Sequence, residues 1–282
     1  MCIARQVVDF YHGEAGTVYV QLVSTTSAAE LWVDLPIYVG SRFEHSPLVL
    51  VAAQINYEEV ATEIKHPQAR EVQKALGSRW TALQAAPIVQ TTMTPAGAVN
   101  SPQRGAYRLS TSDSKWALAV NPDNFVLETN AYTRWADMAA QLELATQAIA
   151  DVFDPASRLR VGLRYVDQIQ LPEGYGSWQG LIPSSLLGLG ADPRFAPGVL
   201  GSEKRYLLQL DAGAQCLFRH GLMADGKKTP GRTYLLDFDV FNDQPTMFDA
   251  EAIQVVLQSL HAHAGALFEA SIEPELRNQL RG

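Results

Sequence analysis

The chain has 282 residues, of which 47% are hydrophobic and 18% charged, and this length and composition fit one large or two small globular domains. Its net charge of −8 disfavours electrostatic binding to nucleic acid or to an anionic membrane, because such binding needs clustered Lys and Arg. The cysteines, Cys2 and Cys216, lack the spacing of a zinc site or a disulfide framework, and we expect a cytoplasmic protein with no metal and no cofactor.

The N-terminal region matches nothing that follows it. Residues 1–40 read as an extension of short extended pieces, and we expect residues 1–38 to lie outside the folded unit. Translation starting at Val39 would account for such an extension. From Pro47 the pattern becomes regular, with a strand at Leu48–Ile55 that is apolar on both faces.

The rest of the chain predicts one unit that occurs twice. The segments Phe125–Tyr132 and Tyr234–Phe241 each read as a strand that leads into a long amphipathic helix. The apolar stripe of the first helix recurs in the second at a constant offset, from Met138 to Ile253 and onward. We therefore expect residues 41–156 and 157–282 to be the two halves of a duplicated domain.

Each half has the order strand, helix, several strands, helix. The predicted class is α+β, with each half a mostly antiparallel sheet covered by its own long helix. The order is also that of each half of the TATA-binding-protein fold, a likeness of topology that carries no function. Asp249 is placed to cap the second long helix.

Charged residues alternate with apolar ones on three of the predicted strands. The apolar positions would face a helix, which leaves the charged positions together on the uncovered sheet face. Opposite charges on neighbouring strands predict ion pairs. The cluster is either a structural network, which we favour, or a binding surface or acid–base pair. Its members are Glu128, Arg160, Arg164, Asp237 and Asp239.

Other residues carry weaker signals. His261 and His263 are two apart on a helix, so they point in different directions and do not share a metal ion. Trp178 lies in a Gly-bearing loop and is a candidate contact residue, as are the loops 172–180 and 224–231. The chain has no nucleophile elbow, phosphate-binding loop or HExxH motif.

Three blocks of sequence carry a resemblance to a known family. They are Pro47-Leu-Val-Leu-Val-Ala-Ala-Gln54, Phe125-Val-Leu-Glu-Thr-Asn-Ala-Tyr-Thr-Arg-Trp135 and Arg160-Val-Gly-Leu-Arg-Tyr-Val166, followed by a closing helix with Leu260-His261 and Phe268. Over residues 42–275 the chain resembles the sporadically distributed, uncharacterised TIGR-catalogue bacterial protein family. The resemblance implies no known activity. A patchy distribution is typical of mobile accessory or defence genes, which suggests a defence-related role.

The function that these observations favour is a non-enzymatic binding or accessory protein, acting on a protein or small-molecule partner. The alternative is an enzyme with a carboxylate and arginine site at the junction of the halves, around Arg164, Glu128 and Asp237. A deep pocket with an unpaired carboxylate would favour the enzyme, whereas charges that neutralise one another would favour the binding protein.

Overall fold

The computed structural model describes residues 7–12, 18–23, 32–35, 38, 40, 43–86, 91–94, 97–100, 105–211, 213–223 and 232–281, with the backbone alone in 7–12, 18–23, 91–94 and 97–100. Two small hairpins pair within themselves. They are β1 (Val7–His12) with β2 (Val18–Val23), and β5 (Thr91–Thr94) with β6 (Gly97–Asn100). None of the described helices is both long enough and apolar enough to cross a bilayer.

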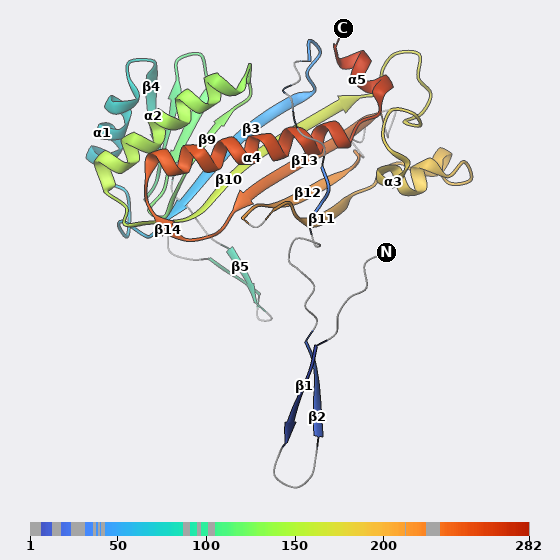
Figure 1. Cartoon of the computed structure of the whole chain (residues 1–282). Coiled ribbons are helices and arrows are strands. Elements are labelled where there is room, and N and C mark those ends of the chain that lie inside the picture. Colours follow the sequence, from blue (N-terminus) through green and yellow to red (C-terminus); the bar gives the residue numbers. More distant parts are fainter. Residues whose placement is uncertain are drawn as a thin grey trace.

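A single ten-stranded sheet forms the body of the protein (Figure 1). Every neighbouring pair of strands in it is antiparallel. A short strand, β14 (Thr246–Met247), pairs with one of the central strands, β10. The other nine lie in the order β11 (Lys204–Gln209), β12 (Gln215–Leu222), β13 (Thr233–Asn242), β10 (Ser157–Gln170), β3 (Leu48–Tyr57), β9 (Asn124–Thr129), β8 (Trp116–Val120), β7 (Tyr107–Thr111) and β4 (Trp80–Ala85).

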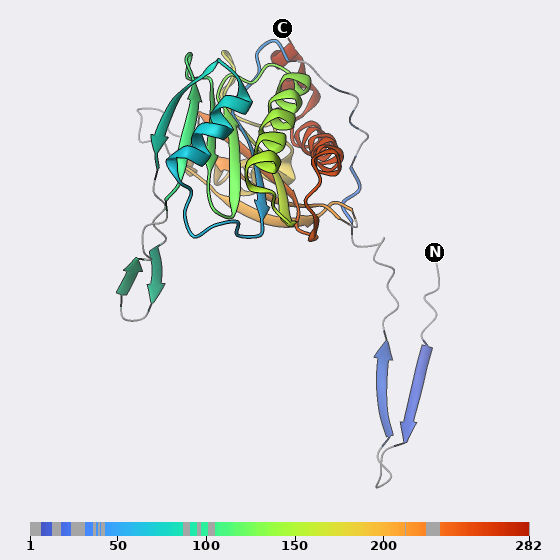
Figure 2. The same cartoon turned by 90° about the vertical axis from the view of Figure 1, so that its left-hand side faces the viewer.

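Three helices cover one face of this sheet, as Figures 1 and 2 show. They are α1 (His66–Leu76), α2 (Trp135–Phe153) and α4 (Ala250–Ala270). Helix α2 packs between the other two, and α4 also contacts β10 and β13. The shorter helices α3 (Ser184–Leu187) and α5 (Pro274–Arg281) and the 3-10 turns Gly188–Ala191 and Ala196–Gly198 lie outside this layer.

The predicted fold class is wrong in its architecture. The protein has one large sheet, mostly strands by content, and is not built as two halves that each own a sheet and a long helix. The offset between the two helices therefore reflects two similar amphipathic stripes that pack on a shared sheet. Sequence periodicity reports which side of a helix is buried, and it carries no information about which sheet lies beneath.

The pairing of β3 with β10 explains why a single sheet forms. These two central strands pair from Arg158 against Tyr57 to Asp167 against Leu48. A strand at the edge of a separate sheet would leave its backbone N–H and C=O groups unpaired on one side. Joining the two strands satisfies those groups and lets α2 and α4 pack side by side over one continuous surface.

The core lies between the sheet and the helices. The strands supply every second residue to it, so that in β3 the residues Val51, Ala53 and Ile55 are fully buried. The predicted helix stripes meet them, and burial of each large side chain stabilises the fold by roughly 1.5–3 kcal/mol. Buried stripe residues are Met138, Leu142, Ala145 and Ile149 on α2, and Ile253, Leu257, Leu260 and Ala264 on α4.

The capping role expected of Asp249 is confirmed. Its side chain accepts a hydrogen bond from the Ala252 N–H at 2.7 Å, which satisfies one free donor at the start of α4. Helix α1 ends at Leu76, because Gly77 terminates it and β4 begins at Trp80.

Part of the expected N-terminal extension contacts the body. The Val33 N–H donates to the Gln209 carbonyl at 2.9 Å, and the side chains of Val33 and Leu35 pack against the core. The Tyr38 ring lies edge-on to His261, with 5.7 Å between the ring centres. The described residues before position 40 therefore include some that belong to the packed structure.

Candidate functional site: the uncovered face of the sheet

The face of the sheet that points away from α1, α2 and α4 carries the predicted charged residues. Strand register shows this directly, because residues opposite one another in an antiparallel pair point to the same side. Asp239 lies opposite Arg164, Arg164 opposite Ala52, and Ala52 opposite Glu128. Arg160 and Asp237 follow by the two-residue period of their strands, so all five predicted residues share this uncovered face.

Asp237 forms the centre of the largest ion-pair group. Arg164 binds it with two hydrogen bonds, from Nε to Oδ1 at 2.7 Å and from Nη2 to Oδ2 at 2.8 Å. Arg219 on β12 binds the same carboxylate, with Nε 2.9 Å from Oδ2 and Nη2 also bonded to it. The Asp237 side chain is only 2% exposed, whereas those of Arg164 and Arg219 are 39% and 31% exposed.

This arrangement fixes the charge of Asp237. Burial alone would favour the neutral acid, but the hydrogen bonds from Arg164 and Arg219 lower the pKa of the carboxyl below its ordinary value. The hydrogen bonds to Asp237 in turn raise the pKa of Arg164. The carboxylate is thus ionised at neutral pH and its two oxygens are engaged.

Arg160 and Asp239 form a second pair on the same face. The Arg160 Nη2 lies 3.0 Å from Asp239 Oδ2, and its guanidinium also stacks over the Phe241 ring at 4.6 Å from the ring centre. Gly162 makes this conformation possible, because a Cβ at that position would overlap the Arg160 guanidinium. The cluster therefore depends on a strand glycine as well as on charge.

Glu128 does not join Arg164. It pairs with Arg108 on β7, while Ala52 of β3 lies between Glu128 and Arg164 in the register. The predicted set is therefore two groups, one on β10, β12 and β13 and one on β7 and β9. Strand spacing explains the division, since β3 inserts a small residue between them.

Two residues of the network were missed by the sequence analysis. Arg219 follows the buried Cys216 and Phe218 at strand spacing, and Arg108 precedes the buried Leu109 in the same manner. The alternation of side chains along a strand is enough to put both residues on the uncovered face. The strand order, which puts β12 beside β13 and only β8 between β7 and β9, was the information needed to assign their partners.

Trp178 is a core residue and takes no part in this face. It is 5% exposed and packs against Tyr234, with 5.5 Å between the ring centres. Its carbonyl accepts hydrogen bonds from the N–H groups of Leu181 and Ile182, which fold this segment into a turn. The loop composition suggested exposure, but this turn buries the ring. The candidate loop 224–231 lies outside the described residues.

The two histidines of α4 have separate partners. His261 stacks on Trp135, with 4.4 Å between ring centres, and its Nδ1 lies 2.9 Å from the Tyr165 hydroxyl. Burial lowers the pKa of His261 to about 4. His263 pairs instead with Asp211 at 2.8 Å. Within the part of the chain that the structure describes, no three potential metal ligands gather.

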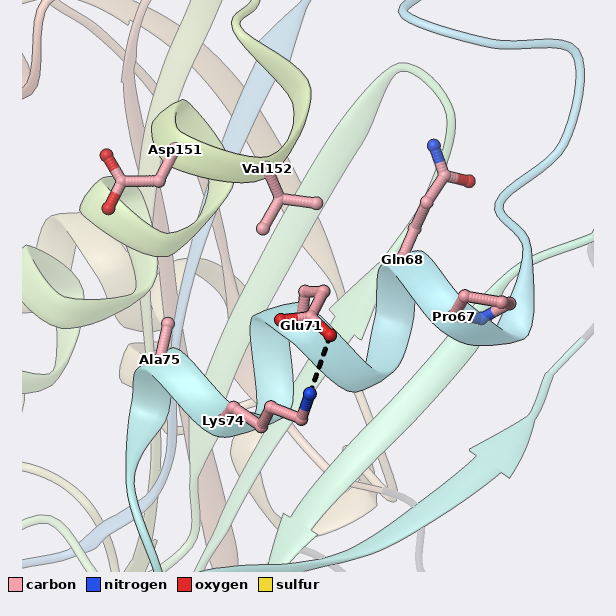
Figure 3. Close-up of a pocket in the computed structure, with 7 residues that line it drawn as sticks. All are labelled: Pro67, Gln68, Glu71, Lys74, Ala75, Asp151 and Val152. Carbon is pink, nitrogen blue, oxygen red and sulfur yellow. Dashed lines mark hydrogen bonds and ion pairs between the residues drawn. The ribbon is translucent and has the colours of Figure 1, made fainter.

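A groove of about 700 Å³ lies between α1 and α2, on the helix side of the molecule (Figure 3). An ion pair between Lys74 and Glu71, 2.7 Å apart and well exposed, borders it. No nucleophile and base are paired among its lining residues, which makes it a surface feature of helix packing. The lining is Pro67, Gln68, Glu71, Lys74, Ala75, Asp151 and Val152.

Neither a scan against protein-family models nor a search of curated proteins finds a match to this chain. The resemblance to the sporadically distributed bacterial family thus stays a prediction.

Proposed function

We propose that this chain is a non-enzymatic binding or accessory protein that contacts a protein partner through the uncovered sheet face around Arg164. One observation carries the proposal. The acids of the cluster, Glu128, Asp237 and Asp239, are each paired with arginine, so the charges neutralise one another.

This pairing is unsuited to acid–base catalysis. A general acid or base works best when its pKa is near the operating pH. The two arginines move the pKa of Asp237 the other way, away from neutrality. Arg164 and Arg219, in contrast, are each about one third exposed and offer the edge of a guanidinium to a carboxylate or carbonyl of a partner. Arginine is enriched at protein interfaces for this reason.

Apolar and small side chains surround the charges. Leu207 and Leu217 extend the row of Asp239 and Arg164, and Val126 lies in the neighbouring row. A broad sheet surface that combines arginines with apolar side chains fits the surface of another protein, whereas a small ligand needs a concave pocket.

The test is affinity capture from the native host followed by mass spectrometry, with two matched variants. Ala52→Gln adds bulk at the centre of the uncovered face, and Val255→Gln makes a comparable polar change on α4, where Val255 is 71% exposed. Both should keep the wild-type melting temperature. We expect Ala52→Gln to lose a partner that the wild type and Val255→Gln retain.

Two results would contradict the proposal. The first is an identical set of captured proteins for all three chains. The second is turnover in a broad hydrolase and transferase screen that Asp237→Asn or Glu128→Gln abolishes without loss of folding, which would establish the enzyme with a site around Arg164 in its place.

A further inference from the structure

Within the part of the chain that the structure describes, one edge of the ten-stranded sheet, β11, has backbone groups free to accept another strand. Two hydrogen bonds reveal which residues face β12, from the Leu210 N–H to the Ala214 carbonyl and from the Ser202 N–H to the Leu222 carbonyl, both 2.9 Å. Bonded pairs alternate along an antiparallel ladder, so the even-numbered residues of β11 bond to β12. The N–H and C=O groups of Arg205, Leu207 and Gln209 consequently point away from the sheet.

The outer side of β11 is already able to form such bonds. The Gln209 carbonyl accepts the Val33 N–H there at 2.9 Å. Among the described residues, no backbone hydrogen bond reaches Arg205 or Leu207 from that side. Four backbone groups, two donors and two acceptors, thus remain in a row on the edge.

Side chains on and before β11 are unusually apolar for an exposed edge. Tyr206 is 46% exposed and Leu207 is 64% exposed. Five of the eleven exposed large hydrophobic side chains described fall between residues 189 and 207, namely Leu189, Phe195, Leu200, Tyr206 and Leu207. Apolar side chains on an open edge favour association with another strand.

The opposite edge, β4, has a protection that β11 lacks. It has a register irregularity between Trp80 and Ala82. Such a bulge is a usual means by which proteins prevent pairing at an edge. Strand β11, in contrast, pairs with β12 without a register shift.

We infer that β11 pairs with β11 of a second copy of this chain, antiparallel about a two-fold axis at Tyr206, to form a homodimer with one continuous sheet. In this register Arg205 lies opposite Leu207 of the second copy and Leu207 opposite its Arg205. These two pairs use all four free backbone groups and leave the Gln209 carbonyl to Val33. Tyr206 then faces its own counterpart across the axis.

The side chains of β11 fit this self-pairing. Besides the Arg205 and Leu207 pairs, Lys204 lies opposite Leu208, so no like charges face one another directly. The pairing ends there, because Val33 occupies the outer side of Gln209. Like charges directly opposed destabilise a strand pair, whereas two aromatic rings stabilise it by about 0.2–1 kcal/mol. A two-fold arrangement also closes the assembly at two copies, because β4 is protected.

Light scattering coupled to gel filtration tests the dimer over a range of protein concentrations. The wild type should shift from a mass of 30.9 kDa toward twice that value as concentration rises. Leu207→Pro removes an outward N–H and leaves every bond to β12, so it should remain monomeric with an unchanged circular dichroism spectrum. Leu207→Val, which keeps the N–H, should still dimerise.

A cross-linking experiment fixes the register independently of that variant. In a Cys2→Ser background, Tyr206→Cys should form a disulfide between two copies on mild oxidation, because the two Cβ atoms would be about 4.5–5.5 Å apart. Lys204→Cys, whose counterpart lies four residues further along the strand pair, should not.

The possible results distinguish a second copy of this chain from a different partner at the β11 edge. A wild type that stays monomeric at every concentration overturns the inference, and protection of the Arg205 and Leu207 amides from hydrogen exchange only on addition of a host lysate would assign the edge to a partner strand. A dimer that tolerates Leu207→Pro and shows no Tyr206→Cys cross-link would use another surface, and the inference would be wrong.

Discussion

The two faces of the sheet shift the pKa of a buried aspartate in opposite directions. Asp237 points to the uncovered face, where Arg164 and Arg219 bind it and lower the pKa of its carboxyl. Asp167, one strand away on β10, lies opposite Leu236 and therefore points toward the helix layer. There burial, together with the charge of Asp237, raises the pKa of Asp167 to about 8.

The difference teaches that exposure alone does not decide the charge of an acid in this fold. Both residues are almost inaccessible, with Asp237 1% exposed and Asp167 4% exposed. Asp237 keeps its charge because two guanidinium groups replace the lost water, whereas no ion pair or hydrogen bond to Asp167 occurs within the described residues. The uncovered face accommodates charge by pairing, and the covered face does so by neutralising the acid.

The largest expected effect is on the covered face. Phe238 is fully buried and stacks on Phe218, with 4.8 Å between ring centres. Phe238→Ala should lower the free energy of unfolding by about 3–5 kcal/mol, because it leaves a cavity under α4. Urea denaturation measures this, with Leu217→Ala on the other face as control, expected below about 1 kcal/mol. Equal losses for both variants would mean that the two faces are equally packed.

The second effect concerns the pairing of Asp237. Arg164→Ala or Arg219→Ala alone should destabilise by about 1 kcal/mol, since one arginine still binds the carboxylate. The double variant should lose about 3–4 kcal/mol, more than the sum of the single losses, because Asp237 is then buried without a partner. A double-mutant cycle by chemical denaturation gives the coupling. Simple additivity would show that Asp237 is hydrated and independent of both arginines.

The same residues show how much of this region could be predicted from the sequence. Alternation correctly placed Arg160, Arg164, Asp237 and Asp239 on one face, because the side-chain period of a strand is local information. The separation of Glu128 from Arg164 depends on β3 lying between β9 and β10, which is a long-range pairing. The duplicated architecture failed for that reason too, since the strand periodicity is the same whether β3 and β10 form two sheet edges or the middle of one sheet.

A smaller effect is expected from pH. The folded state keeps the Asp167 proton up to about pH 8, whereas an unfolded aspartate loses it near pH 4, so folding stability falls as pH rises through this window. Asp167→Asn removes the dependence, so its stability relative to the wild type should rise by about 1 kcal/mol per pH unit between about pH 5 and about pH 8. Denaturation of both proteins at each pH measures the gain. The difference cancels the contributions of His261 and His220, whose pKa values burial lowers to about 4. A gain that is independent of pH would show that Asp167 is ionised in the folded protein.

The smallest expected effect tests whether the N-terminal segment packs against α4. Gly265 is within α4, and a Cβ there would come within 2.6 Å of the Tyr38 ring. Glycine in a helix costs about 1 kcal/mol relative to alanine, so Gly265→Ala should stabilise α4 by that amount if nothing lies above it. With Tyr38 in place the added methyl group must displace the ring, and we expect no gain or a loss. In a Tyr38→Ala background the same substitution should raise the free energy of unfolding by about 1 kcal/mol. Thermal and urea unfolding of the four proteins give the coupling between the two residues. An equal gain in both backgrounds would show that Tyr38 does not contact α4. The segment before residue 40 would then be an extension outside the fold.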